Sequence, residues 1–126
     1  MEFQERIHKR LKPMPWRRWP LGFAGSFSKE DVTAFRQGFL PRDMDDQWLV
    51  RTVGDWVYVH RSWTGSCIYD LQLRATPQGW AVGRSWVNRN RRDYRGSSLD
   101  EERDLCRSLI DRLILSKPES ETPPPR

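Results

Sequence analysis

Cysteine and histidine are scarce in this sequence, which has two of each among 126 residues. The cysteines form no CxxC pair and the histidines no HxxxH pair, so the spacing does not predict a structural zinc site. No apolar run approaches the roughly 20 residues that span a bilayer, and MEFQERIHKRLKPMPW at the N-terminus lacks the apolar core of a secretory signal. We therefore expect a cytoplasmic protein with reduced cysteines, no membrane association, and no metal or other cofactor.

Apolar residues are also few, at 37% of the chain against 31% charged residues. The length suits one domain with one core. Seven tryptophans nevertheless supply large side chains that bury well. The composition therefore predicts a small core that is rich in aromatic rings.

Positive charge is concentrated in two short segments of a chain whose formal net charge is +5. Residues 1–20 contain six Lys or Arg against two Glu, and residues 84–95 contain five Arg against one Asp. Such clusters are typical of proteins that bind an anionic partner, such as nucleic acid, nucleotide phosphates or an acidic protein surface. A solvated face that serves only solubility is the alternative interpretation.

Both ends of the chain are predicted to lie outside the folded domain. Residues 1–24 indicate a basic arm, because prolines at positions 13, 15 and 20 force an extended chain. In this arm Trp16 and Trp19 bracket Arg17 and Arg18, and the rings either pack back onto the core or reach outward to a partner protein or base. Burial is the commoner fate of such rings, and the sequence leaves both arrangements open. Residues 116–126 contain four prolines and nothing to bury, which predicts a disordered tail.

Residues 25–115 predict a single α+β domain. A short helix is expected from Lys29 to Gln37, with Ser28 as N-cap, Gly38 as the stop, and Val32, Phe35 and Phe39 facing inward. Segments rich in β-branched and aromatic residues follow, and short glycine-containing connections separate them. They predict a four-stranded antiparallel meander over residues 48–53, 56–63, 67–74 and 79–89.

The residue periodicity also predicts which side chains face the core. Alternation groups Val57, Val59, Arg61 and Trp63 on one face, opposite Trp56, Tyr58, His60 and Ser62, and it groups Cys67 with Tyr69, Leu71 and Leu73. The final helix should begin at a capping box of Ser98 and Glu101. Its apolar stripe should cover the sheet and consist of Leu105, Cys106, Leu109, Ile110, Leu113 and Ile114, with Glu102, Arg103, Arg107 and Asp111 outside it.

The segment HRSWTG, residues 60–65, admits three interpretations. It lacks an acidic orienting residue and a GxSxG pattern, which argues against a serine nucleophile. His60 could act as a general acid or base beside Tyr69 or Asp70, as in a nucleotide-processing enzyme. The third interpretation is a turn in which Ser62 and Thr64 bond the backbone near Gly65, Trp63 packs in the core and His60 makes a cross-strand contact.

Two loops carry further candidate binding residues. Asp43, Asp45 and Asp46 could hold a divalent cation, but the spacing is not that of an EF-hand, so capping and pairing with arginines are favoured over a metal site. The segment WVNRNRRDYRG, residues 86–96, combines forked phosphate donors with a stacking ring. It is the strongest candidate site, although no RNP, KH or zinc-finger signature accompanies it.

The run MDDQWLVRTVGDWVYVHRSWTGSCIY, residues 44–69, resembles small bacterial proteins that share an aspartate-rich lead into a tryptophan-containing strand, then HRSWTG and an Ile-Tyr pair. The resemblance implies that residues 60–65 act together, and it implies no activity, catalytic residue or cofactor.

The sequence thus favours binding over catalysis, with two classes of partner. In the first, the ligand carries phosphate, as a nucleic acid or nucleotide does, and the predicted contacts are His60, Arg61, Ser62, Arg84, Arg89, Arg91, Arg92, Tyr94 and Arg95. In the second, the protein is an immunity-type, antitoxin-type or adaptor-type partner of another protein, with Trp16, Arg17, Arg18 and Trp19 at the interface.

Overall fold

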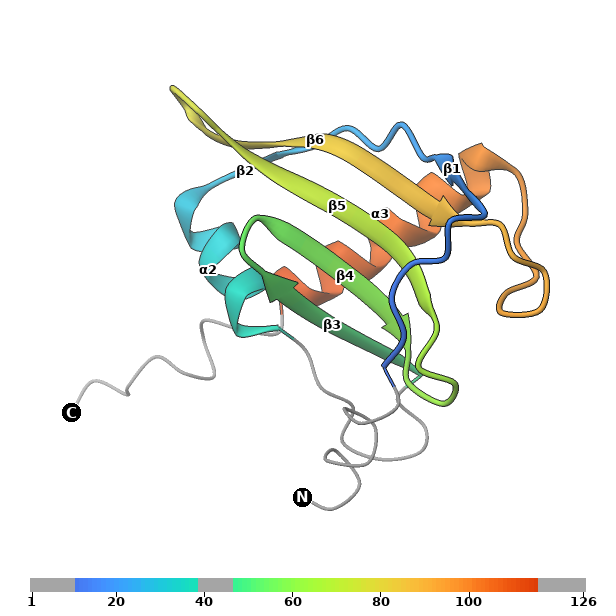
Figure 1. The fold of residues 1–126 in the computed structure, drawn as a ribbon. Helices are drawn as coiled ribbons and strands as arrows, with labels where there is room; N and C mark the ends of the chain where they lie inside the picture. The colour runs from blue at the N-terminus through green and yellow to red at the C-terminus, as the bar shows by residue number, and fades with distance from the viewer. Residues whose placement is uncertain (1–10, 39–46, 116–126) are drawn as a thin grey trace, which may run out of the picture.

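The computed structural model describes residues 11–38 and 47–115. These residues form one antiparallel sheet and two helices, an α+β domain as the sequence predicts (Figure 1). Predictions for Phe39, for Asp43, Asp45 and Asp46, and for residues 116–126 lie outside the described residues. The elements are β1 (Arg18–Pro20), β2 (Ser26–Phe27), α2 (Lys29–Gln37), β3 (Trp48–Val53), β4 (Trp56–Arg61), β5 (Cys67–Thr76), β6 (Gly79–Asn88) and α3 (Leu99–Leu115).

The sheet has six strands, so the predicted number of four is wrong. Its order is β1-β6-β5-β4-β3. β2 also pairs with β6, near the start of that strand, whereas β1 pairs with its end. The predicted meander is therefore present as β3 to β6, and the N-terminal segment adds two short strands to its edge. Strands of three and two residues are too short for alternation to reveal them in a sequence, since the alternating pattern needs at least four positions.

Helix α2 begins and ends as its sequence predicts. Ser28 Oγ accepts a hydrogen bond from the backbone N–H of Asp31, and the Asp31 side chain accepts one from the Ser28 N–H, which completes a capping box. Gly38 ends the helix with φ 76°, and a Cβ there would lie 2.7 Å from the carbonyl oxygen of Val50. Only glycine fits this position, because the backbone is left-handed and β3 packs directly against it.

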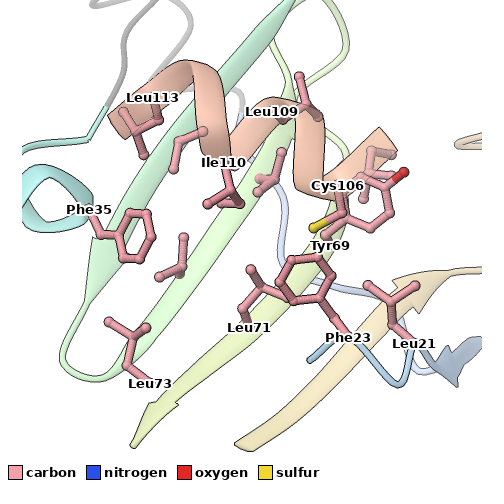
Figure 2. Close-up of a cluster of buried hydrophobic side chains, with 14 of the residues drawn as sticks. Leu21, Phe23, Phe35, Tyr69, Leu71, Leu73, Cys106, Leu109, Ile110 and Leu113 are labelled. Atoms are coloured by element: carbon pink, nitrogen blue, oxygen red, sulfur yellow. The ribbon is translucent and has the colours of Figure 1, made fainter. Parts of the chain in front are cut away.

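Helix α3 lies across one face of the sheet and closes the core (Figure 1). Cys106, Leu109, Ile110 and Leu113 of α3 belong to one buried cluster with Tyr69 and Leu71 of β5, and Figure 2 shows Cys106 beside the Tyr69 ring. The predicted stripe is wrong at two positions.

Glu102 is fully buried on this inner face, and Leu105 is exposed. Positions 102, 106, 109, 110 and 113 share one side of a 3.6-residue helix, so the true stripe starts one turn earlier, at a charged residue.

The arm contributes to the core through residues that follow its tryptophans. Leu21 and Phe23 are buried against the sheet and α3 (Figure 2). Trp16 and Trp19 remain 86% and 58% exposed, so of the two arrangements that the sequence left open for their rings, packing onto the core is not the one found. Trp19 sits on β1, which is an edge strand among the residues that the structure describes.

A bulge changes the faces at the start of β5. Tyr69 pairs with Val59, but Cys67 pairs with His60, so the register shifts by one residue between them. Ile68 joins the core, and Cys67 lies on the opposite face, where its thiol donates to Asp70 Oδ1 at 3.0 Å. The predicted grouping of Cys67 with Tyr69 is therefore wrong, because strict alternation cannot foresee a bulge.

Candidate functional site

The arginine-rich segment forms a folded loop, residues 89–98, between β6 and α3. Asn88 Oδ1 accepts from the backbone N–H of Asn90 at 2.7 Å, and Asn90 Oδ1 accepts from that of Arg92 at 3.1 Å. The carbonyl of Asn90 then accepts from the N–H groups of Asp93 and Tyr94. Asparagine suits such turns because its short side chain bonds the backbone two residues on. The asparagines therefore shape the loop.

Glu102 anchors this loop to the first turn of α3. One carboxylate oxygen, Oε1, accepts from the hydroxyls of Tyr69 at 2.6 Å and Tyr94 at 2.8 Å. The other, Oε2, accepts from the Ser97 N–H at 2.7 Å and lies 3.6 Å from Arg89 Nη1. A fully buried carboxylate is stable only when it is paired and hydrogen-bonded in this way.

The two tyrosines at Glu102 remain protonated donors over the ordinary pH range. Burial, reinforced by the hydrogen bond to Glu102, raises the pKa of Tyr94 to about 12. Burial likewise raises the pKa of Tyr69 above its usual range. Tyr94 is therefore committed to the loop anchor through its hydroxyl, and it offers a potential ligand only the face of a half-buried ring.

Gly96 allows the loop to close over the Glu102 carboxylate. A Cβ at this position would lie 2.6 Å from Arg89 Nη1 and 2.7 Å from Glu102 Oε2, which is closer than real contacts allow. The backbone can approach the Arg89–Glu102 pair only because residue 96 has no side chain. The sequence analysis missed both Gly96 and Glu102. The one available signal for Glu102 was its helical spacing of four from Cys106.

Three arginines of the loop remain available to a ligand. Arg89 donates to the Ser97 carbonyl at 2.9 Å and pairs with Glu102, so its guanidinium is already used. Arg91, Arg92 and Arg95 are exposed, and within the described part of the chain none has a side-chain hydrogen bond or ion pair. A hollow of about 280 Å³ opens here, lined by Arg89, Arg91, Tyr94, Arg95 and Gly96.

The structure brings the two basic segments of the sequence together. β1 pairs with the last residues of β6, with Arg18 opposite Asn88, and the Arg89 N–H donates to the carbonyl of Arg17 at 3.0 Å. Near the start of the described part of the arm, residues 11–24, the Lys12 N–H donates a hydrogen bond to the carbonyl of Gly65. The arm therefore runs along one end of the sheet, from the β4–β5 connection to the arginine loop (Figure 1).

The segment HRSWTG is a tight connection at this same end of the sheet. The Arg61 N–H donates to the Ser66 carbonyl, and the Gly65 N–H donates to the Arg61 carbonyl. Thr64 Oγ1 accepts from the Ser66 N–H at 3.2 Å, as the turn interpretation predicts. Trp63 is 49% exposed, so its predicted place in the core is wrong, because it lies at the tip of the connection, beyond the reach of α3.

His60 is built into the fold on the face of the sheet opposite α3. Its Nε2 accepts from Arg51 Nε at 3.1 Å, and its Nδ1 lies 3.0 Å from the Gly65 carbonyl. Since a guanidinium only donates, Nε2 must be unprotonated and the proton resides on Nδ1. The ring is fully buried and both nitrogens are engaged, so this geometry gives an acid or base role for His60 no support.

The other predicted ligand contacts are spread over the domain. Arg61 and Ser62 lie at the same end of the sheet as the loop, where Arg61 packs 5.1 Å from the centre of the Trp48 ring and Ser62 is buried. Arg84 is exposed beside the bulge between β5 and β6, where its N–H donates to Gln72 Oε1. Gln72 is five residues along β5 from Cys67, the partner of His60, or about 17 Å of strand. Arg84 therefore does not share a site with His60.

The face opposite α3 holds a second group of polar side chains around Asp70. Cys67 donates to Asp70, and Arg18 and Arg51 lie near enough to act on it electrostatically. Burial raises the pKa of Asp70, and the thiol and the two arginines only partly offset this effect. Arg18 packs over Trp86 at 4.2 Å and Arg51 over Tyr58 at 4.9 Å, so the charged groups here are held by neighbours within the sheet.

Neither a metal centre nor a membrane span is found in residues 11–38 and 47–115: these residues contain no group of three or more metal-ligating side chains, and neither helix is long and apolar enough to cross a bilayer. No family model matches the chain, and no curated protein or solved structure is significantly similar to it. The shared action of residues 60–65, implied by the resemblance, stays a prediction.

Proposed function

We propose that this protein is a non-enzymatic binding module for a phosphate-bearing ligand, a nucleic acid or nucleotide, and that the ligand contacts Arg91, Arg92 and Arg95. The observation that carries the proposal is that one arginine of the loop is paired inside the protein while the other three are exposed. Glu102 and Arg89 pair with each other and hold the backbone, while Arg91 and Arg95 line one hollow and Arg92 is exposed beside them in the sequence. A loop fixed before binding loses little conformational entropy when the ligand arrives.

The charge balance at the hollow supports an anionic ligand. The Asp93 carboxylate accepts from Asn88 Nδ2 at 3.3 Å, and Glu102 is fully buried, so the nearest acidic groups are turned inward. Guanidinium groups suit phosphate because their N–H donors match two phosphate oxygens at once. The backbone of Arg17 adjoins the loop, which extends the basic surface onto the arm.

Calorimetric titration with ATP and with inorganic tripolyphosphate tests the proposal. The variant Arg91→Gln/Arg95→Gln should weaken binding of both by about tenfold or more, since each charged hydrogen bond contributes about 1.5–3 kcal/mol. Arg74→Gln/Arg112→Gln is the matched control, because both side chains are exposed away from the loop and the charge change is the same. Equal losses in the two variants would show non-specific charge attraction and would refute a loop site.

A protein partner is the second candidate, favoured by the exposure of Trp16 and Trp19. Tryptophan and arginine are enriched among residues whose truncation costs about 2 kcal/mol or more at interfaces. The test is a pull-down from host lysate, with and without nuclease. A stoichiometric protein complex that survives nuclease and weakens with Trp16→Ala would favour this candidate over phosphate binding.

A further inference from the structure

Three exposed tryptophans lie at the end of the sheet that carries the arginine loop. Trp16 is 86% exposed, Trp19 58% and Trp63 49%, whereas most large apolar side chains of the described residues are buried. β4 ends, β5 begins and β6 ends at this edge of the molecule, and the arm crosses it (Figure 1). Exposed apolar side chains that gather on one part of a surface mark an interaction site more often than isolated ones do, so the position of these rings favours a binding role.

Backbone hydrogen bonds fix the chain that carries Trp16 and Trp19 against the base of the arginine loop. The Arg18 N–H donates to the Trp16 carbonyl at 3.0 Å, which turns the chain, and β1 then holds Trp19 opposite Val87. Between them, the Arg17 carbonyl accepts from Arg89 at the base of the loop. We define the arm–loop surface as Trp16, Arg17, Trp19, Arg91, Arg92 and Arg95, all of them exposed.

We infer that the arm–loop surface binds single-stranded nucleic acid, with the arginines on its phosphates and the rings of Trp16 and Trp19 stacked on its bases. This inference rests on the proposed phosphate-binding function and names the ligand for it. Proteins that bind single strands combine a basic track with aromatic stacking platforms, because every base has a flat face and every nucleotide a charge.

A duplex fits this surface less well. Its bases are already stacked on one another, and its major groove is read by a helix or a two-stranded ribbon. The arm–loop surface is made instead from an extended arm and a loop, while α3 lies flat on the sheet with its apolar side buried. Trp16 and Trp19 are three residues apart, so their Cα atoms are separated by about 10 Å at most, a spacing that lets each ring meet a different base of one unstacked strand.

The test measures fluorescence anisotropy of a fluorescein-labelled 12-nucleotide oligothymidylate and of a labelled 12-base-pair duplex at one salt concentration. Wild-type protein should bind the single strand at least about tenfold more tightly than the duplex. Trp16→Leu/Trp19→Leu should lose about tenfold or more in affinity for the single strand and leave the duplex unchanged. Trp16→Phe/Trp19→Phe is the matched control, since phenylalanine retains a stacking ring, and should retain most of the affinity.

The outcomes separate this inference from the proposed function. If the leucine variant binds the single strand as wild type does while Arg91→Gln/Arg95→Gln loses both probes, base stacking is refuted and phosphate binding survives. If wild type binds neither probe nor tripolyphosphate, both fail. Both tryptophans are exposed, so the variants should fold, and an unchanged circular dichroism spectrum checks this.

Discussion

At the scale of single residues, Glu102 is the residue on which the candidate site depends. It is a carboxylate with no exposed surface, and it joins β5, the arginine loop and α3 through the hydroxyls of Tyr69 and Tyr94 and the N–H of Ser97. Its negative charge also holds Arg89 inward. One buried acidic residue thus determines which arginines of the loop are available for binding.

Glu102→Gln should destabilise the protein by about 2 to 3 kcal/mol, because the amide of glutamine presents donors to the Ser97 N–H and the Arg89 guanidinium, which are donors themselves. Urea unfolding followed by circular dichroism measures the change. Asp104→Asn, at an exposed position of the same helix, is the control and should stay within about 0.5 kcal/mol of wild type. A Glu102→Gln variant as stable as the control would contradict the anchoring role.

Asp70 should make stability depend on pH in the direction opposite to a salt-bridged carboxylate. Burial raises its pKa in the folded protein above the ordinary value of 3.8, so the folded state favours the protonated form. The stabilising contribution is fully present below pH 3.8 and is lost as pH rises through the folded pKa. Asp70→Asn should therefore gain stability relative to wild type as pH increases from about 3 to 7. Unfolding free energies of the two proteins at several pH values test this, and a relative loss over that range would refute it.

At the scale of elements, a short sequence signal determines where each helix begins, and the elements it packs against determine its position. The Ser28 and Ser98 boxes start the two helices, and Gly38 ends the first where β3 leaves no room for a side chain. The first turn of α3 then supplies Glu102 to the loop that precedes it. Loop and helix are therefore joined through Glu102, whose carboxylate accepts from Tyr94 and Ser97 of the loop.

Ser28→Ala should cost about 1 kcal/mol of stability, because the N–H of Asp31 loses its acceptor at the start of α2. Chemical denaturation monitored by tryptophan fluorescence gives the value. Ser108→Ala, at an exposed position within α3, removes a hydroxyl without removing a cap and should change stability by less than about 0.5 kcal/mol. Equal effects of the two substitutions would mean that the cap is not the source of the loss.

At the scale of the whole molecule, charge is distributed unevenly. Residues 1–20 and 84–95 carry an excess of positive charge, while the rest of the chain is net negative. In the described part of the chain the two segments meet where the Arg89 N–H donates to the carbonyl of Arg17. Summed charges on one edge attract an anionic polymer from solution more strongly than the same charges spread evenly.

Binding of the 12-nucleotide strand should therefore weaken steeply with salt, since each arginine that meets a phosphate releases a counterion. Plotted as the logarithm of affinity against the logarithm of salt concentration, the slope should fall in size by about 1 for each of Arg91 and Arg95 replaced by glutamine. Anisotropy titrations at several salt concentrations give the slopes. An affinity that does not change with salt would refute phosphate contact altogether.

The sequence by itself determined the local elements. The bounds of α2 and β3, the N-cap at Ser28 and the capping box of Ser98 and Glu101 follow from signals a few residues long. These signals are local because the bonds they make join residues two to four positions apart. The α+β class follows from the same periodicities.

Only the tertiary structure decided what those elements bring together. The pairing of Arg18 with Asn88, the exposure of Trp16, the bulge that turns Cys67 away from the core and the burial of Glu102 all depend on contacts between distant residues. A sequence pattern records which side chains are apolar, but it does not record which neighbour will satisfy a buried charge. That neighbour is set by strand register and helix packing, which is why the sequence pattern places Glu102 outside the apolar stripe and leaves the position of the arm's tryptophans open.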